Sequence, residues 1–371
     1  MRISIMKAAT RIVRAGLPTA QQAAPFLPGP TFAAPYHAAG DPTTAPYNYG
    51  RLHNPTWTQF EQALSELEGG TALAFASGMA AIAAVFGSVL RPGDKVVLPS
   101  DSYYLTRVLA NGYFTQMGVQ VVMSPTTNNS QLEHLDGAKL LWLETPSNPG
   151  LDVCDIVALS QAAHERGVLV AVDNTTATPL GQQPLALGAD FSVASDTKAL
   201  TGHSDLILGH VAVREAALMD GIRMWRNQIG AVPGPMEVWL AHRSMATLHL
   251  RLERQCASAL TIAQFMSEQK GVTDVRYPGL AAHPAHDLAR QQMQYFGPII
   301  SFTLADEAAA QHFLSACKLV YEATSFGSLH TTAERRARWG GDIVPAGFIR
   351  MNIGCEDVDD LMADLAQALD H

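Results

Sequence analysis

The stretch Asp190-Phe-Ser-Val-Ala-Ser-Asp-Thr-Lys-Ala-Leu-Thr-Gly-His-Ser-Asp205 joins a short apolar segment to hydroxyl groups and one lysine. Residues 191–194 are mostly apolar, as expected of a buried strand, so the residues after them emerge at its carboxyl end. There Lys198 can have a lowered ammonium pKa and act as a nucleophile toward a carbonyl. The hydroxyl groups of Ser195 and Thr197 can bind a phosphate. An exposed lysine after a strand is the alternative, so the neighbouring segments decide.

The composition indicates a globular protein of two domains. The chain has 371 residues, is 47% hydrophobic and carries a net charge of -9. Its basic residues form no run longer than Arg335-Arg336, which argues against nucleic-acid binding and favours a small-molecule substrate. Four cysteines lie far apart without a Cys-x-x-Cys pair, so we expect neither disulfides nor a zinc site, as is typical of a cytoplasmic protein.

One segment resembles a membrane span by length alone. Residues from Gly69 to Leu90 include no charged side chain and are numerous enough to cross a bilayer. However, Ala76-Ser77-Gly78 divides the segment into a strand-sized piece and a helix-sized piece. We therefore expect a buried strand–turn–helix unit and no contact with a membrane.

The order of the remaining segments predicts three parts. Residues 1–47 are rich in Pro, Ala and Thr without periodicity, which predicts an extended arm on a neighbouring subunit. Residues 48–242 alternate strands and helices, which predicts an α/β domain with a mostly parallel seven-stranded sheet and helices on both faces. The expected strands are Ala72 to Ala76, Lys95 to Leu98, Val119 to Met123, Leu140 to Leu143, Leu169 to Val172, Phe191 to Ala194 and Leu208 to Val213.

A smaller α+β domain is expected over residues 243–371. A long amphipathic pattern from Met236 to about Met266 leads into it. Its expected strands are Ile299 to Leu304, Leu319 to Ala323 and Phe348 to Ile353. In the larger domain, the expected helices include Thr58 to Glu68, closed by Gly69, together with Gly78 to Leu90 and Asp155 to Arg166.

Polar groups follow several of the predicted strands at their carboxyl ends, where such sheets bind ligands. Ser77-Gly78-Met79 starts a helix whose free N–H groups can hold an anion. Asp173 ends one strand, and Lys198 follows another. Pyridoxal 5'-phosphate needs this combination: the lysine attaches it, the carboxylate keeps its pyridine nitrogen protonated, and the N–H groups hold its phosphate. The sequence therefore predicts a pyridoxal-phosphate site.

Other readings of these residues are weaker. Asp173 could cap a helix, and Ser195 and Thr197 could form turns, but several such coincidences would be needed. No Gly-x-Gly-x-x-Gly motif follows the early strands and no lysine follows a glycine, which excludes the usual dinucleotide and phosphate-loop motifs. His283 and His286 flank a proline without further ligands, so we predict no metal site.

The ordered motifs resemble the cysteine and methionine metabolism family of pyridoxal-phosphate enzymes from about Thr10 to the C-terminus. They are Tyr49-Gly50-Arg51, Asn54-Pro55-Thr56, Leu67-Glu68-Gly69-Gly70, Ser77-Gly78-Met79, Glu144-Thr-Pro-Ser-Asn-Pro149, Val172-Asp173-Asn174-Thr175, Ser195-Asp-Thr-Lys198, Gly202-His-Ser-Asp205, Tyr277-Pro-Gly-Leu280 and Arg350 before Gly354. The resemblance implies fold type I, with residues 48–242 as the cofactor-binding domain, and a homotetramer whose active sites are shared across tight dimers.

The resemblance also implies roles for individual residues. Lys198 would attach the cofactor, Asp173 would pair with its pyridine nitrogen, and Tyr103 would stack on its ring; these three are the expected catalytic residues. Gly78, Met79, Ser195 and Thr197 would hold the phosphate, with Tyr49 and Arg51 from the neighbouring subunit. Arg350, with Asn148 and Ser325, would bind the substrate's α-carboxylate, for which a planar guanidinium is well suited. For Arg350, a surface ion pair is the alternative.

The sequence departs from the family pattern near the expected substrate. Tyr103-Tyr104-Leu105-Thr106 replaces Tyr-Gly-Gly-Thr, and His330 stands where γ-acting members often have glutamate. The cluster Glu334-Arg335-Arg336-Ala-Arg338-Trp339 is either a solvated basic face or part of the distal substrate pocket. The resemblance favours a carbon–sulfur lyase, cystathionine γ-lyase first. Cystathionine γ-synthase, cystathionine β-lyase, methionine γ-lyase and a cofactor-binding regulator without turnover are the alternatives.

Overall fold

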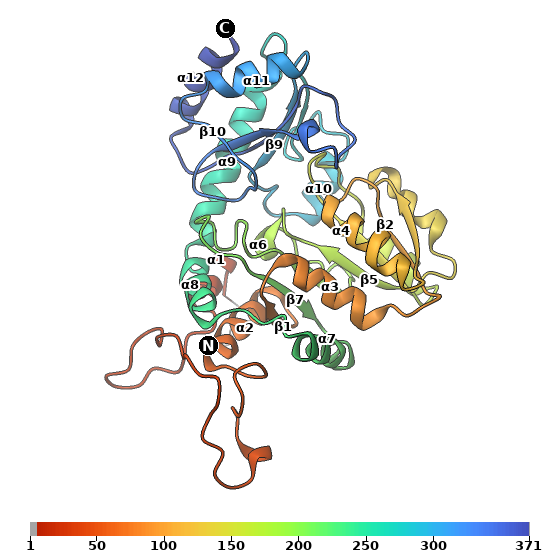
Figure 1. Cartoon of the computed structure of the whole chain (residues 1–371). Coiled ribbons are helices and arrows are strands. Elements are labelled where there is room, and N and C mark those ends of the chain that lie inside the picture. Colours follow the sequence, from red (N-terminus) through yellow and green to blue (C-terminus); the bar gives the residue numbers. More distant parts are fainter. Residues whose placement is uncertain (1–5, 371) are drawn as a thin grey trace.

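The computed structural model describes residues 6–370 and contains two sheets, each with its own helices (Figure 1). The larger sheet has the order β1-β7-β6-β5-β4-β2-β3, and only β7 is antiparallel to its neighbours. This confirms the expected mostly parallel, seven-stranded sheet. Its strands are β1 (Thr71–Phe75), β2 (Lys95–Pro99), β3 (Gln120–Ser124), β4 (Leu140–Glu144), β5 (Leu169–Asp173), β6 (Phe191–Ala194) and β7 (Gly209–Val213).

Helices cover both faces of this sheet, and strand β4 shows why. Leu140 and Trp142 pack in the core under α3 (Gly78–Val89) and α7 (Ala216–Ile229). Leu141 and Leu143 point the other way, into the core under α5 (Ile156–His164). Because successive side chains alternate between two covered faces, the strand is apolar throughout.

The other helices are α1 (Ala8–Arg14), α2 (Pro55–Glu68), α4 (Tyr104–Leu109), α6 (Thr178–Gly181), α8 (Pro235–Met245), α9 (Leu248–Ser267), α10 (His286–Gln292), α11 (Glu307–Ala316) and α12 (Val358–Leu369). Short 3-10 helices lie at Pro42–Thr44, Thr127–His134 and Arg336–Trp339, and a short π-helix lies at Ala110–Phe114. Helix α2 begins before the expected Thr58, because the Asn54 side chain accepts the N–H of Thr56 and Pro55 occupies the first helical position. Gly69, with φ 71°, closes α2 as predicted.

The uncharged segment from Gly69 to Leu90 divides as predicted. It forms β1 and α3, joined by Ala76-Ser77, and the Ser77 side chain caps the N–H of Ala80 at 3.1 Å. Within residues 6–370, no helix combines the length and the apolar character needed to cross a membrane.

The smaller sheet has five strands in the order β10-β11-β12-β9-β8, rather than the three expected. They are β8 (Thr273–Arg276), β9 (Ile299–Thr303), β10 (Tyr321–Glu322), β11 (Thr332–Arg335) and β12 (Phe348–Asn352). The prediction missed β8 and β11 and overestimated the length of β10. Both missed strands contain charged residues that hide the strand pattern, and in β11 two of these, Glu334 and Arg335, are buried.

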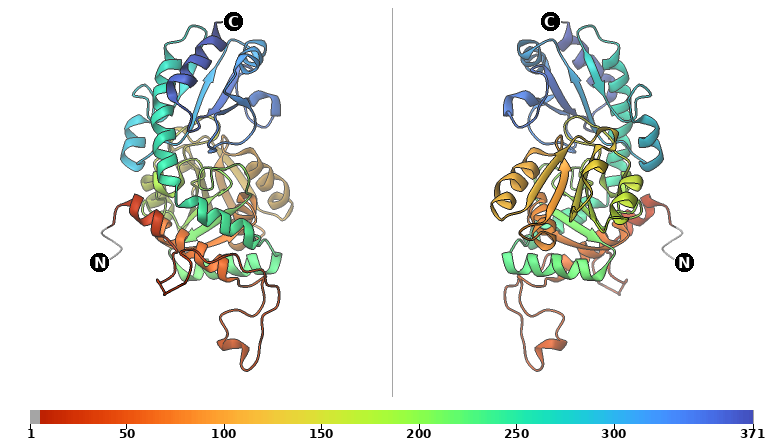
Figure 2. Two further views of the ribbon diagram at one scale, coloured as in Figure 1. Left: turned by 90° about the vertical axis from the view of Figure 1, so that its left-hand side faces the viewer. Right: turned by 90° about the vertical axis from the view of Figure 1, so that its right-hand side faces the viewer.

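The amphipathic pattern from Met236 to Met266 forms two helices, not one. Thr247 lies outside helical geometry (φ -101°, ψ 2°) between α8 and α9. At this break the carbonyl of Ser244 accepts the guanidinium of Arg251 at 3.0 Å. Helix α9 then extends along one side of the molecule, from α8 to the smaller sheet, as Figures 1 and 2 show. The division into 1–47, 48–242 and 243–371 stays a prediction.

The N-terminal segment is less uniform than expected. Residues 8–14 form α1, which packs on α2 and α9 and buries Ile12 in their core. The residues that follow, up to about 50, form long irregular loops that project from the body of the chain (Figure 2). Phe26 and Phe32 in these loops are 89% and 71% exposed.

Candidate active site

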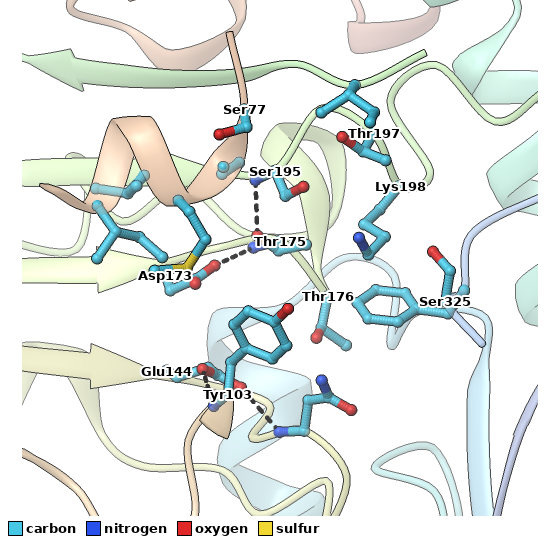
Figure 3. A pocket seen from close by; sticks show the side chains of 18 of the residues that line it. Ser77, Tyr103, Glu144, Asp173, Thr175, Thr176, Ser195, Thr197, Lys198 and Ser325 are labelled. Atoms are coloured by element: carbon cyan, nitrogen blue, oxygen red, sulfur yellow. Dashed lines mark hydrogen bonds between the residues drawn. The ribbon is translucent and has the colours of Figure 1, made fainter. Parts of the chain in front are cut away.

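A cavity of about 340 Å³ lies at the carboxyl ends of β4, β5 and β6 (Figure 3). The start of α3 forms one wall and the C-terminal part of the chain forms another. Ten of the twelve predicted site residues line it: Gly78, Met79, Tyr103, Asn148, Asp173, Ser195, Thr197, Lys198, Ser325 and Arg350. Tyr49 and Arg51 do not.

Lys198 points into this cavity from the loop after β6 (Figure 3). Its Nζ lies 5.6 Å from the centre of the Phe326 ring. Burial, and then the positive charge of Arg350, lower the pKa of Lys198 to about 8, while Asp173 opposes the shift. The amine is therefore far more nucleophilic near neutral pH than an ordinary lysine.

Asp173 ends β5 and is only 6% exposed. One carboxylate oxygen accepts the N–H of Thr175 at 3.0 Å. Burial raises the pKa of Asp173, and the hydrogen bonds from Thr175 and the charge of Lys198 oppose the rise. A cation placed against this carboxylate, such as a pyridinium nitrogen, would offset that cost of burial.

The start of α3 and the loop after β6 form the predicted anion site. A Cβ at Gly78 would lie 2.6 Å from the Cβ of Ser195, so glycine allows this close approach. The N–H groups of the first turn of α3 have no acceptor within the helix, and apart from that of Ala80, which Ser77 accepts, they could bind an anion here. The Thr197 hydroxyl donates to the carbonyl of Leu208 and accepts the N–H of Leu208, both at 3.1 Å, so it can donate to an anion only after its O–H turns away from that carbonyl.

Glu144, which sequence analysis did not single out as a site residue, holds two of those that were predicted. Its carboxylate accepts the N–H of Tyr103 at 2.7 Å and the N–H of Asn148 at 2.9 Å. Burial, and then the charge of Asp173, raise the pKa of Glu144 well above its usual value. The hydrogen bond from the Tyr103 N–H to Glu144 holds Tyr103 in place, and its ring lies over the cavity beside Asp173 (Figure 3).

Arg350 is buried in β12, which excludes a surface ion pair. Its guanidinium donates to Asn148 Oδ1 at 2.8 Å and to the carbonyl of Ser325 at 2.9 Å. It also pairs with the carboxylate of Glu334. Burial, and then the charge of Arg336, lower the pKa of Arg350 to about 10. Its Nε is buried without a partner among residues 6–370, so donor capacity is left for an anionic ligand.

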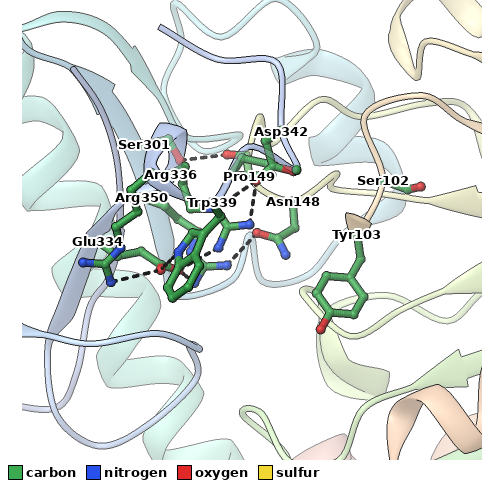
Figure 4. A network of polar contacts seen from close by, with 12 residues as sticks. Ser102, Tyr103, Asn148, Pro149, Ser301, Glu334, Arg336, Trp339, Asp342 and Arg350 are labelled. Atoms are coloured by element: carbon green, nitrogen blue, oxygen red, sulfur yellow. Dashed lines mark hydrogen bonds and ion pairs between the residues drawn. The ribbon is translucent and has the colours of Figure 1, made fainter. Parts of the chain in front are cut away.

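The cluster from Glu334 to Trp339 is not a solvated basic face. Glu334 is fully buried, and Arg335 and Arg336 are 9% and 6% exposed. Arg336 joins Glu334 at 2.7 Å and Asp342 at 2.6 Å, directly behind Arg350 (Figure 4). The cluster is an ion-pair network that abuts the substrate side of the cavity.

Three other residues lie apart from the cavity. Tyr49 and Arg51 are exposed, and Arg51 donates to the carbonyl of Asn227. Their predicted role in a neighbouring subunit stays a prediction. His330 is exposed against Tyr321, with 6.2 Å between the ring centres.

Several supporting residues were missed because only the fold brings them together. Thr175 accepts the N–H of Ser195 at 2.8 Å and so joins two strand ends. Arg251 of α9 donates to the carbonyls of Ala199 at 2.6 Å and Leu200 at 3.0 Å, just after Lys198. Thr175 belongs to the motif that follows Val172, so the sequence contained a signal for its role. Arg251 lies in an ordinary amphipathic helix, which contains no such signal.

Comparison with known proteins agrees with this geometry. A family model described as Cys/Met metabolism PLP-dependent enzyme matches residues 10–370. The chain belongs to this family. It is therefore a pyridoxal-phosphate enzyme of cysteine and methionine metabolism that acts on a small amino-acid substrate, with the expected fold type I architecture.

Members of the family with different named activities are similar to the chain. A Streptomyces coelicolor protein, provisionally named cystathionine gamma-lyase, is 58% identical over 97% of this chain and 93% of its own length. The cystathionine beta-lyase of Lactococcus lactis subsp. cremoris is 39% identical over 87% and 88%. The crystal structure of cystathionine gamma synthase from Xanthomonas oryzae pv. oryzae in complex with cystathionine has a TM-score of 0.95 and 33% identity, covering 98% of each chain.

The residues around the cavity fit the family's cofactor. The cavity is lined by one amine, that of Lys198, and by two buried carboxylates, Asp173 and Glu144. Each oxygen of Glu144 already accepts a backbone N–H, so Asp173 is the carboxylate that would pair with a protonated ring nitrogen. The start of α3 offers N–H groups for a phosphate. The individual roles of these residues stay predictions.

Proposed function

We propose that this family member is a cystathionine γ-lyase, which converts L-cystathionine into cysteine, 2-oxobutanoate and ammonia. The observation that carries the choice of γ-lyase is the similarity to the Streptomyces protein of that provisional name. The placement of Lys198 and Arg350 against one aromatic ring supports the amino-acid chemistry that the family's activities share. Lys198 Nζ and Arg350 Cζ lie 5.6 Å and 5.2 Å from the centre of Phe326. A guanidinium that binds the α-carboxylate thus lies near an amine that can reach Cα. The provisional name of the Streptomyces relative supports γ-lyase among the family's activities.

The proposed reaction requires this chain to take protons from two carbon atoms of the substrate. Bound pyridoxal phosphate supplies the electron sink. The Lys198 amine, with a pKa of about 8, takes the proton from Cα, passes it on, and then takes a proton from Cβ. The γ-thiolate leaves and is protonated to give cysteine. The remaining carbon skeleton is protonated at Cγ, and its hydrolysis releases 2-oxobutanoate and ammonia. Arg350 and Asn148 hold the α-carboxylate throughout.

Cystathionine γ-synthase is the second candidate, because it uses the same proton transfers but lets a thiol add at Cγ. The departure at His330 weakens the case for cystathionine as substrate, since a carboxylate there would attract its distal ammonium and a histidine carries no negative charge. However, His330 is exposed outside the cavity of its own chain. The β-lyase and methionine γ-lyase activities of other relatives remain alternatives of the same chemistry.

The test compares three substrates: L-cystathionine, L-methionine, and an O-acylhomoserine plus cysteine. A higher kcat/KM for release of 2-oxobutanoate, cysteine and ammonia from cystathionine supports the proposal. Faster synthesis of cystathionine assigns the synthase activity instead. Pyruvate with homocysteine as the main products assigns the β-lyase activity, and preferred cleavage of methionine assigns the methionine γ-lyase activity.

We also propose that the enzyme is a cytoplasmic homotetramer with sites shared across each dimer. Ile207 lines the cavity and yet is 66% exposed, and Phe26 and Phe32 are exposed on the projecting loops. Apolar side chains so exposed at a cavity and on an arm support a covering neighbour. Tyr49 and Arg51 would reach the neighbour's phosphate site. Four free cysteines support a reducing compartment.

A further inference from the structure

Behind Arg350 lies a series of ion pairs between side chains of alternating charge, of which Figure 4 shows Glu334, Arg336 and Asp342. Arg107 of α4 meets Asp342 at 3.1 Å, and Asp342 meets Arg336 at 2.6 Å. Arg336 meets Glu334 at 2.7 Å, and Glu334 meets Arg350. All five side chains are at most 15% exposed, so solvent screens their interactions weakly.

One oxygen of Glu334 is shared between two guanidinium groups. Oε1 accepts both Arg336 Nη1 and Arg350 Nη2, whereas Oε2 accepts Trp339 Nε1 at 2.8 Å. The set contains three arginines and two carboxylates, so one positive charge is in excess. Its Arg350 end lines the cavity. Without Arg336, Arg350 would be the only guanidinium hydrogen-bonded to Glu334, since Arg338 lies 3.8 Å from Oε2, and the Glu334–Arg350 pair would be neutral.

We propose that Arg336 is a positioning residue for Arg350, because it shares the Glu334 carboxylate and so leaves Arg350 with net positive charge for the substrate's carboxylate. Asp342 and Arg107 hold Arg336 in place from the far side. Arg336 is outside the cavity and acts only through Glu334 and Arg350. This inference rests on the proposed role of Arg350.

The test uses a pair of ligands that differ only in a carboxylate, L-2-aminobutanoate and propylamine. Binding to the cofactor-loaded enzyme is followed by the change in visible absorption of the cofactor. Arg336→Gln should weaken aminobutanoate binding about tenfold, which corresponds to about 1.4 kcal/mol, and propylamine binding less than about twofold. Arg338→Gln is the matched control, because Arg338 is 3.8 Å from the other oxygen of Glu334 and is paired with Glu322. It should leave both affinities within about twofold.

Arg336→Lys keeps the charge and should restore much of the loss for aminobutanoate. If Arg336→Gln does not fold, a smaller loss in Arg336→Lys that is confined to aminobutanoate still supports the proposal. The proposal is wrong if Arg336→Gln weakens the binding of both ligands equally or does not weaken the binding of aminobutanoate. It is also wrong if Arg338→Gln weakens aminobutanoate binding as much as Arg336→Gln does. If Arg350→Gln in the otherwise unchanged enzyme weakens neither ligand selectively, the proposed role of Arg350 itself is wrong.

Discussion

The side chain of Lys198 illustrates how a single residue acquires its chemistry from its surroundings. Burial and the charge of Arg350 both disfavour the ammonium form, and Asp173 only partly compensates. The resulting pKa of about 8 leaves a substantial neutral fraction at neutral pH, which a nucleophile or base requires. Function at this residue therefore depends on the balance of two opposite charges in the same cavity.

This balance predicts the pH dependence of cofactor attachment. Only the neutral amine of Lys198 attacks a carbonyl, so the rate at which the cofactor-free protein acquires visible absorption from added pyridoxal phosphate should rise with pH. The rate should be half-maximal near pH 8, the pKa of Lys198, and level off above it. A rate that still climbs about tenfold per pH unit between pH 9 and 10 would indicate an ordinary lysine.

Two variants check the sign of each charge. Arg350→Met removes a group that lowers the pKa of Lys198, so the midpoint should move to higher pH. Asp173→Asn removes a group that raises this pKa, so the midpoint should move to lower pH. Shifts in the same direction in both variants would contradict the electrostatic explanation.

At the scale of elements, helix α9 supports the loop after β6 that carries Lys198. Arg251 is 6% exposed and donates to the carbonyls of Ala199 and Leu200. Arg251→Leu should leave these carbonyls without a donor, lower the free energy of unfolding by about 2–4 kcal/mol and weaken cofactor binding about tenfold. Arg254→Leu is the control on the same helix, because the Arg254 side chain is 43% exposed, with a 3.5 Å pair to Asp357 and a hydrogen bond to the carbonyl of Glu356. Equal effects of the two variants on unfolding and cofactor titration would exclude this role of Arg251.

The buried histidine of β7 joins two further elements. His210 Nδ1 lies 2.6 Å from Asp196, just before Lys198, and Nε2 lies 2.9 Å from Glu68 of α2. Burial alone would lower the pKa of His210, but the charges and hydrogen bonds of Asp196 and Glu68 raise it to about 10. The folded protein thus holds an imidazolium at pH values where the unfolded chain does not.

A stability measurement tests this imidazolium. Since the pKa is raised on folding, its contribution is complete below about pH 6.5 and is lost as the pH rises through about 10. His210→Asn should cost about 3–5 kcal/mol at pH 6.5, because two buried carboxylates lose their cation. The difference from the wild type in urea unfolding should narrow toward pH 10. The exposed His330→Asn is the control; a His210→Asn deficit that stays constant with pH would contradict a charged His210.

The elements show where prediction from the sequence succeeds. Every strand of the larger sheet was predicted, because a parallel sheet covered on both faces requires continuous apolar segments. Strand β11 was missed because its Glu334 and Arg335 are buried as ion pairs, which a single sequence does not display. The local motifs predicted Lys198, Asp173 and Arg350 as site residues, because each lies in a short recognisable segment. The contacts by which Arg251 and Glu334 support the site could not be predicted, because they join residues that only the fold brings together.

At the scale of the whole molecule, the described chain leaves its cavity partly uncovered. Ile207 is at once a cavity residue and 66% exposed, and Tyr49 is 46% exposed on a segment that points away from the body of the chain. The guanidinium of Arg51 donates to the carbonyl of Asn227 and lies 5.6 Å from the centre of the Tyr49 ring. Exposed aromatic and basic groups on a projecting segment are what a site completed by a second subunit requires.

Mixed subunits test whether the site is shared. If Arg51 serves the phosphate site of its neighbour, a dimer of one Arg51→Ala chain and one Lys198→Ala chain contains one site with both defects and one with neither. Each parent variant should have little activity. Random exchange should restore roughly a quarter of the wild-type activity, because half of the dimers are mixed and each has one intact site of two. Verified exchange without recovery would place Arg51 in the site of its own subunit or in no site, whereas recovery assigns it to the neighbour.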